Sequence, residues 1–170
     1  GYLAQVVPHK MPLTIGWDVS GVVDQVGAEV SHLAVGDAVY SRPNIARDGC
    51  YAEYVVVAAS ELAAKPNTLS HNEAAAVPLA GLTAWQGLFH HAQLKRGERV
   101  LVHAGAGGVG SFAIQFAKWA GAHVIATSSA VNEALVRSLG ADEFVDYRSQ
   151  RFEAVLAKVD VVLDTIGGDT

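Results

Sequence analysis

The chain has 170 residues, of which 51% are hydrophobic and 17% charged, and its net charge is −5 at pH 7. This composition suits a well-buried α/β protein and argues against a disordered chain. The 12 basic residues form no block, so we expect neither nucleic acid nor an anionic membrane as a partner. No apolar run approaches the roughly 20 residues of a membrane span. The single cysteine excludes an intramolecular disulfide, and we expect a reducing, cytoplasmic setting.

Short apolar runs separated by turn residues occupy the chain up to about Pro66. We predict strands over residues 16–23 and 35–40, where glycines mark bends and turns. Residues 50–58, CYAEYVVVA, form the strongest strand candidate in this half of the chain. Frequent turns between short strands indicate a small, barrel-like β unit.

The pattern changes between residues 66 and 80. Ser70-x-x-Glu73 is a capping box in front of three alanines, so it predicts the start of a helix. Pro78 interrupts or ends that helix, and residues 79–94 are predicted to form a second one. We therefore predict two domains, residues 1–78 and residues 79–170.

Residues 99–121 predict a strand, a glycine turn and a helix, in that order. Residues 100–102 are apolar and β-favouring, which is typical of a buried parallel strand. Gly105, Gly107 and Gly110 fit the G-x-G-x-x-G spacing, and apolar residues then recur at helical spacing. A pyrophosphate needs close approach to the amides and positive dipole of a helix N-terminus, which glycines allow. The pattern predicts a dinucleotide site; a glycine turn without a ligand is the alternative.

Strands and helices alternate after this turn. Strands are predicted at residues 123–127, 143–147 and 159–165, and helices at residues 132–139 and 152–158. Alternation over segments of this length implies a right-handed, parallel, doubly wound sheet.

The strand predicted at residues 123–127 is not followed by an acidic residue. In the NAD-binding form, an Asp or Glu about 20 residues past the first glycine binds the ribose 2′-hydroxyl, and residues 127–130, TSSA, stand there. Serine hydroxyls can donate to a 2′-phosphate that a carboxylate would repel, which favours NADPH. Ser128 and Ser129 bind this phosphate, cap the following helix, or do both. Arg148, beside Tyr147, is the nearest basic candidate.

Several segments together resemble the medium-chain dehydrogenase/reductase superfamily, and most closely its zinc-independent quinone oxidoreductase (zeta-crystallin-like) branch. The resemblance covers the whole chain. Its motifs are GWDVSGVV at residues 16–23, VGDAVY at 35–40, YAEYV at 51–55, EAAAVP at 73–78, GLTAW at 81–85 and the glycine turn.

The resemblance implies an α/β fold in which a partial GroES-like β domain is followed by a partial Rossmann doubly wound parallel sheet, with the active site in the cleft between them. It also implies the cofactor-binding residues. Thr83 would lie near the nicotinamide carboxamide. The turn that covers the pyrophosphate would consist of Gly105, Ala106, Gly107, Gly108, Val109 and Gly110. The 2′-phosphate and adenosine would be surrounded by Ser128, Ser129 and Tyr147, and the segment after the last strand, Thr165, Ile166 and Gly167, would lie along the cofactor. The lysine that this branch often carries after the serine pair is replaced here by Asn132-Glu133.

Zinc alcohol dehydrogenases of this superfamily have Gly-His-Glu where this chain has Gly16-Trp17-Asp18. An indole cannot bind zinc, which takes imidazole, thiolate or carboxylate ligands. The later cysteine ligand of these enzymes falls near Ala80-Gly81, which has no ligating side chain, and the four-cysteine lobe is absent. We therefore expect no catalytic zinc and no metal ligands.

Four other chemistry-prone positions are open to ordinary structural interpretations. Cys50 is expected to be a structural thiol rather than a nucleophile, and the His90-His91 pair is expected to be solvated or to cap a helix. His103 either orients the glycine turn or is an ordinary residue at a strand end. Tyr2 lies close to where the family places a tyrosine near the substrate.

These observations predict an NADPH-dependent oxidoreductase that passes hydride to a quinone or an α,β-unsaturated carbonyl without a metal. We assign no catalytic acid. The alternatives are a non-catalytic NADPH-binding protein of the same fold and a zinc-dependent alcohol dehydrogenase. We also expect the chain to be an internal fragment of a longer enzyme, which would be a homodimer when full length.

Overall fold

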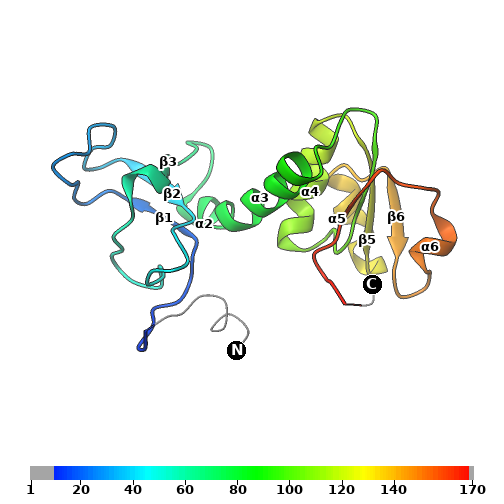
Figure 1. Cartoon of the computed structure of the whole chain (residues 1–170), viewed down its shortest axis with the longest axis horizontal. Helices are drawn as coiled ribbons and strands as arrows, with labels where there is room; N and C mark the ends of the chain where they lie inside the picture. The colour runs from blue at the N-terminus through cyan, green and yellow to red at the C-terminus, as the bar shows by residue number, and fades with distance from the viewer. Residues whose placement is uncertain (1–9, 169–170) are drawn as a thin grey trace. The chain divides into compact units, whose positions relative to one another are not determined.

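The computed structural model describes residues 10–168, and the chain divides into two compact units, Gly1–Leu79 and Ala80–Thr170 (Figure 1). The division follows Leu79, one residue past the boundary that the sequence pattern predicts. The first unit is built on short antiparallel strands and the second on a parallel sheet with helices.

The first unit contains a three-stranded antiparallel sheet. Strand β1 (Val19–Val22) pairs with β2 (Ala38–Ser41), which pairs in turn with β3 (Leu62–Ala64). A turn with Gly36 at φ +96° precedes β2, and the Gly36 amide donates to the Val23 carbonyl. Two of the three predicted strand regions therefore form strands, although each strand is shorter than its sequence pattern.

The prediction of a strand over residues 50–58 is wrong. Among residues 10–168 this segment has no strand partner, and it ends at a 3-10 turn, η1 (Ala59–Glu61). Its side chains still alternate: Val55 and Val57 are partly buried, while Tyr54 and Val56 are 76% and 80% exposed. The sequence pattern reports the fit of side chains to a half-buried surface, whereas a strand also needs a backbone to pair with.

The capping box at Ser70 forms as the sequence predicts. The Ser70 hydroxyl accepts a hydrogen bond from the Glu73 amide, and the Glu73 carboxylate accepts one from the Ser70 amide, at the start of α2 (His71–Ala75). Helix α3 (Pro78–Trp85) then begins at a proline, whose fixed φ suits the first helical position. It continues into a π-helical segment, η2 (Gln86–His91), so the helix predicted over residues 79–94 changes its winding partway.

The second unit is an α/β unit with a parallel sheet, which confirms the predicted fold class. The strand order is β6-β5-β4-β7, and every neighbouring pair is parallel. Its elements in chain order are β4 (Arg99–Val102), α4 (Gly108–Trp119), β5 (His123–Ser128), η3 (Ala130–Asn132), α5 (Glu133–Ser138), β6 (Glu143–Asp146), α6 (Phe152–Val155) and β7 (Val161–Leu163). Since β5 and β7 flank β4 on opposite sides, the order of the strands reverses between β4 and β7.

The two faces of this sheet pack against different helices. Val100, Val102, Val124 and Ala126 point to the face that α4, α5 and the α3–η2 segment cover. Leu101, Ile125 and Val145 point to the other face, where Phe152, Leu156 and Val159 pack against them. Figure 1 shows α6 beside β6, away from α4. The alternation follows from the two-residue period of a strand, and it decides on which face each residue at the strand ends lies.

Candidate functional site

The candidate site lies at the carboxyl ends of β4 and β7. In open parallel sheets, ligands bind outside the carboxyl ends of the strands where the strand order reverses. The glycine turn, residues 103–107, leaves β4 at this place and leads directly into α4. The predicted motif therefore lies at the position that the topology favours for a ligand.

The glycines of the turn have different surroundings. Gly105 is buried, and a Cβ added there would lie 2.9 Å from the Ala126 Cβ. At Gly110 an added Cβ would lie 2.2 Å from the Ala104 carbonyl oxygen. Gly107 and Gly108 are exposed. Gly105 and Gly110 thus allow close packing within the protein. Gly107 and Gly108 leave backbone exposed at the N-terminus of α4, although a Cβ added at Gly107 would lie 3.2 Å from the Ala104 carbonyl oxygen.

The N-terminus of α4 suits an anion. Gly107 is the N-cap and supplies no capping side chain, and the first turn of α4 contains no acidic residue. The first amides of a helix have no acceptor within the helix, and the helix dipole places partial positive charge beside them. An anionic group such as a pyrophosphate would accept hydrogen bonds from these amides.

Backbone hydrogen bonds hold the turn in place. The Gly105 amide donates to the Thr127 carbonyl at 2.8 Å, and the Gly107 amide donates to the Ala104 carbonyl at 2.8 Å. Between β4 and Gly105, Ala104 has φ +51°, a left-handed conformation that costs energy in a residue with a Cβ. The surroundings of the turn must therefore compensate for this strain.

His103 is the last residue before this strained position. Its side chain is 4% exposed, its Nδ1 lies 3.1 Å from the Thr127 hydroxyl oxygen, and its ring packs edge-on against Phe152 with the ring centroids 4.8 Å apart. Burial lowers the pKa of His103, while the carboxylates of Asp164 and Glu153 act in the opposite direction. The ring is therefore held in its neutral form at neutral pH.

The serines at the end of β5 differ in exposure. Ser128 is 4% exposed, and its hydroxyl donates to the Ser129 carbonyl at 3.0 Å. Ser129 is half-buried, and its hydroxyl oxygen accepts a hydrogen bond from the Asn132 side chain at 3.3 Å. Ser129 is the N-cap residue of η3, but its hydroxyl accepts from a side chain and caps no backbone amide, and Ser128 is buried.

Tyr147 and Arg148 follow the neighbouring strand β6. The Tyr147 amide donates to the Ser128 carbonyl at 3.3 Å, which brings the ends of β5 and β6 together. The Tyr147 ring is 56% exposed, and the Arg148 guanidinium lies 5.8 Å from its centroid. The interaction with Tyr147 raises the pKa of Arg148. A permanent positive charge therefore lies next to an exposed ring at the edge where an adenosine ribose is expected.

The remaining predicted residues lie around the same end of the sheet. Thr83 is an exposed residue of α3, the helix whose Ala80 Cβ lies 3.8 Å from the position of a Cβ added at Gly108. Thr165, Ile166 and Gly167 follow β7 and are exposed. Ala106 and Val109 are half-buried residues of the glycine turn and α4. The Asp164 carboxylate accepts hydrogen bonds from the amides of Ile166 and Gly167, which lower its pKa.

In the first unit, the residues that replace zinc ligands have other contacts. The Trp17 indole donates to the Arg47 carbonyl at 3.2 Å, and the Asp18 carboxylate accepts from the Leu79 amide at 2.7 Å. Burial raises the pKa of Asp18 against the opposing effects of that bond and of Arg42. Within residues 10–168, no group of three or more His, Cys, Asp or Glu residues could hold a metal ion. Tyr2 lies outside the described residues.

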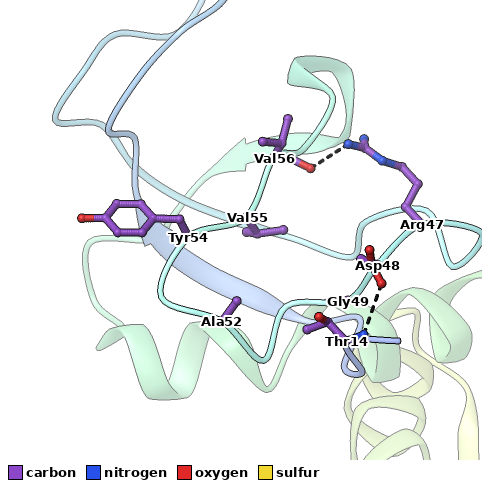
Figure 2. Close-up of a pocket in the computed structure, with 8 residues that line it drawn as sticks. All are labelled: Thr14, Arg47, Asp48, Gly49, Ala52, Tyr54, Val55 and Val56. Atoms are coloured by element: carbon purple, nitrogen blue, oxygen red, sulfur yellow. Dashed lines mark hydrogen bonds between the residues drawn. The ribbon is translucent and has the colours of Figure 1, made fainter. Parts of the chain in front are cut away.

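Figure 2 shows a hollow in the first unit. The Arg47 guanidinium donates to the Val56 carbonyl at 2.9 Å, and the Asp48 carboxylate accepts from the Thr14 amide. The Tyr54 ring points away from the other lining residues (Figure 2). Both charged side chains therefore bind backbone groups of the loops that form the hollow, which gives the loop at residues 47–49 two fixed contacts.

Comparison with known proteins decides the family. A model described as an alcohol dehydrogenase GroES-like domain matches residues 2–67, and one described as a zinc-binding dehydrogenase matches residues 108–170. The chain belongs to the medium-chain dehydrogenase/reductase superfamily, in its quinone oxidoreductase branch.

Two similar proteins are the mitochondrial NAD(P)H oxidoreductase RTN4IP1 of Danio rerio and the chloroplastic NADPH-dependent alkenal/one oxidoreductase of Arabidopsis thaliana. Each is 42% identical, over 168 and 167 residues, covering 95% and 92% of this chain. This chain spans 43% and 42% of their own lengths.

Two solved structures show the same architecture. The quinone oxidoreductase of Coxiella burnetii is 40% identical with a TM-score of 0.92. The Escherichia coli quinone oxidoreductase complexed with NADPH is 32% identical with a TM-score of 0.88. Both comparisons cover 99% of this chain and 54% of the other.

The expectation of a cytoplasmic location is wrong, because similar proteins are mitochondrial or chloroplastic. That expectation depended on the single cysteine, and a low cysteine content does not distinguish one reducing compartment from another. No helix in residues 10–168 is long and apolar enough to cross a membrane.

Proposed function

We propose that this chain is part of an NADPH-dependent oxidoreductase that transfers hydride to a quinone or an α,β-unsaturated carbonyl compound. The observation that carries the proposal is the glycine turn, with Gly107 and Gly108 exposed at the N-terminus of α4 where the strand order reverses. The names of the similar proteins, which include quinone and alkenal/one oxidoreductases, support the same reaction class.

The residues of the second unit fit a dinucleotide. The amides at the start of α4 would bind the pyrophosphate, and the exposed glycines would allow its close approach. The bound dinucleotide supplies the hydride, so the protein mainly positions the acceptor and excludes water. Exposed Thr83 and the segment at residues 165–167 would contact the nicotinamide half. This assignment rests on the resemblance together with their position at the carboxyl end of the sheet.

Preference for NADPH over NADH is supported by charge at the ends of β5 and β6. Ser128 and Ser129 stand where an acid would bind the ribose of NAD, and Arg148 lies beside the exposed Tyr147 ring. Because Ser128 is buried, we assign the 2′-phosphate to Ser129, Tyr147 and Arg148, with Ser128 supporting the edge. A guanidinium can donate two hydrogen bonds to a phosphate.

We also propose that the reaction needs no zinc. Trp17 cannot bind the metal, and the Asp18 carboxylate accepts a backbone amide. Activity that survives dialysis against a chelator, with no zinc in the intact protein on elemental analysis, is the expected result. Loss of activity on chelation that zinc restores would favour the zinc-dependent alcohol dehydrogenase. A homodimer remains a prediction, which sedimentation of the intact protein tests.

The experiment that tests the proposal compares the two nucleotides. NADPH and NADH are titrated by fluorescence, and the loss of nucleotide absorbance is followed with 1,2-naphthoquinone and a simple enone. We expect tighter NADPH binding and acceptor-dependent oxidation. NADPH binding without oxidation would favour a non-catalytic binding protein, and binding of neither nucleotide would overturn the proposal.

Arg148→Ala tests the preference for NADPH. Removal of one charge-assisted interaction of about 1.5–3 kcal/mol is expected to weaken NADPH binding roughly tenfold or more, with NADH binding unchanged. Lys158→Ala is the matched control, because exposed Lys158 precedes β7 at the opposite edge of the sheet. Equal losses for both nucleotides in Arg148→Ala would contradict the assignment.

A further inference from the structure

Two contacts join the start of the glycine turn to Thr127. The Gly105 amide donates to the Thr127 carbonyl at 2.8 Å, and the His103 Nδ1 shares a hydrogen bond with the Thr127 hydroxyl at 3.1 Å. One residue at the end of β5 is therefore held by two residues that flank Ala104. Ala104 is the turn residue with the left-handed φ of +51°.

The two contacts approach Thr127 from different parts of the sheet. Gly105 packs against Ala126 and Ile114, on the face that α4 covers. His103 is on the opposite face, where its ring packs edge-on against Phe152. The His103–Thr127 hydrogen bond therefore holds the carboxyl end of β4 on the face of the sheet opposite the one against which Gly105 packs.

Both side chains of this pair are enclosed. Thr127 is 2% exposed and His103 is 4% exposed, so neither can exchange the shared hydrogen bond freely for water. A buried polar group that loses its partner is costly, because it has already lost its water. The His103–Thr127 hydrogen bond therefore favours a single arrangement of the carboxyl ends of β4 and β5.

From this geometry we propose that His103 and Thr127 are positioning residues for the dinucleotide. Their side-chain hydrogen bond holds Ala104 in its strained conformation and so keeps Gly107 and Gly108 at the N-terminus of α4 in position to bind the pyrophosphate. Neither residue needs to touch the nucleotide. The inference rests on the proposed function, since the turn is taken to bind a pyrophosphate.

The test uses substitutions that remove the hydrogen bond and keep the shape. Thr127→Val removes the hydroxyl from a side chain of the same form, and His103→Phe keeps a ring against Phe152. Thr127→Ser retains the hydroxyl, and His103→Asn places an amide near the position of Nδ1. Ile125→Val is the control for stability, because Ile125 is buried on the same face of β5 as Thr127, in the apolar cluster with Leu101 and Val145, and its side chain has no hydrogen bond to lose.

We expect Thr127→Val and His103→Phe to raise the dissociation constant for NADPH at least fivefold in the intact protein. The double variant should bind no worse than the weaker single variant, because both changes remove the same bond. Thr127→Ser and Ile125→Val should stay within twofold of the wild type, and His103→Asn should recover most of the loss. The KM for NADPH should rise, with kcat at saturation unchanged within twofold.

Amide hydrogen exchange tests the same pair without a nucleotide. In Thr127→Val we expect exchange at Gly105 and Gly107 to be at least tenfold faster than in Ile125→Val. Unchanged exchange and NADPH affinities within twofold of the wild type would overturn the inference. An equal loss of affinity in Ile125→Val would overturn it as well, because the effect would then follow stability alone.

Failure of the inference and failure of the proposed function give different results. A wild-type protein that binds neither NADPH nor NADH overturns the function and, with it, the role of the pair in binding. A wild-type protein that binds NADPH, together with Thr127→Val and His103→Phe variants that bind it equally well, overturns the inference alone.

Discussion

Gly108 and Gly110 belong to the same motif but have opposite surroundings. A Cβ added at Gly110 would lie 2.2 Å from the Ala104 carbonyl oxygen, whereas one added at Gly108 would lie 3.8 Å from its nearest neighbour, the Ala80 Cβ. Gly110 packs against backbone, so a larger side chain has no room there. Gly108 is exposed to solvent, at the surface that we assign to the pyrophosphate.

Gly110→Ala is therefore expected to destabilise the protein. Forced displacement of a packed segment typically costs about 1–3 kcal/mol, and the shifted turn should also lose NADPH affinity. Gly108→Ala is expected to keep or raise stability, since alanine forms a helix more readily than glycine and there is room for a Cβ at this first position of α4, while its methyl group weakens NADPH binding. Thermal unfolding and fluorescence titration measure the two effects. Gly108→Ala with full NADPH affinity would contradict the assignment of this surface.

The spacing of the motif predicts the turn but not the separate roles of its residues. G-x-G-x-x-G specifies where glycine is needed, and the same residue type serves both for packing and for ligand approach. Only the surroundings of Gly105 and Gly110 distinguish them from Gly107 and Gly108. Thr127 shows the same limit, because its contact with His103 depends on the alignment of β4 with β5.

At the scale of elements, charged side chains join β4, β5 and β6 at the amino ends of these strands, the end of the sheet opposite the candidate site. The Glu143 carboxylate accepts hydrogen bonds from His123 at 2.6 Å and from Arg99 at 2.9 Å. These partners lie at the amino ends of β5 and β4. The hydrogen bond from His123 and the interactions with Arg99 lower the pKa of Glu143 below its ordinary value of 4.5, against the opposing effect of burial.

A lowered pKa in the folded state makes the contribution of Glu143 depend on pH. Its ionised form is favoured by folding, so the stabilisation is complete above pH 4.5 and is lost as the pH falls through the folded-state pKa. We expect Glu143→Gln to lower the melting temperature at pH 7, and the difference from the wild type to shrink below pH 4.5. Melting curves from pH 7 to pH 3.5 test this, in low salt because exposed charges are screened.

Glu133→Gln is the control for this measurement. Glu133 pairs with Arg137 one turn along α5, at 2.8 Å and with both side chains more than 40% exposed, and such pairs contribute little. Its melting temperature should follow that of the wild type at each pH. A Glu143→Gln variant whose deficit stays constant down to pH 3.5 would contradict the prediction, because the cause would then be packing rather than charge.

Regular elements were predictable where the pattern that specifies them is local. The capping box at Ser70, the strand–turn–helix at residues 99–121 and the alternation after it depend on residues close together in the chain, and each forms. The segment at residues 50–58 has an equally regular pattern, but a strand depends on a distant partner that the pattern does not contain. Short β3 was missed because its three residues carry too little pattern.

At the scale of the whole molecule, the buried apolar side chains are unevenly divided. In the described part of the chain, the first unit buries Val39, Pro43, Ala74 and Pro78, whereas the second buries two clusters on the two faces of its sheet. Burial of apolar surface is the main favourable contribution to folding. The second unit should therefore be the more stable of the two in the 170-residue chain.

We predict that this chain unfolds in two steps, with the first unit unfolding at the lower denaturant concentration. Trp17 is the only tryptophan of the first unit, and Trp85 and Trp119 belong to the second. A chain with Trp85→Phe and Trp119→Phe reports on the first unit, and Trp17→Phe reports on the second. Urea unfolding followed by fluorescence should give two midpoints, and far-ultraviolet circular dichroism should show both transitions in the unmodified chain.

The order of the two midpoints tests whether buried apolar surface or local hydrogen bonds determine the relative stability of the two units. The capping box at Ser70 and the hydrogen bonds of Arg47 and Asp48 bind loops and a helix end, but they do not enlarge the buried core. Coincident midpoints by both probes would mean that the units unfold cooperatively and would contradict the prediction. NADPH should raise only the later midpoint, since a ligand stabilises the unit whose folded form it binds.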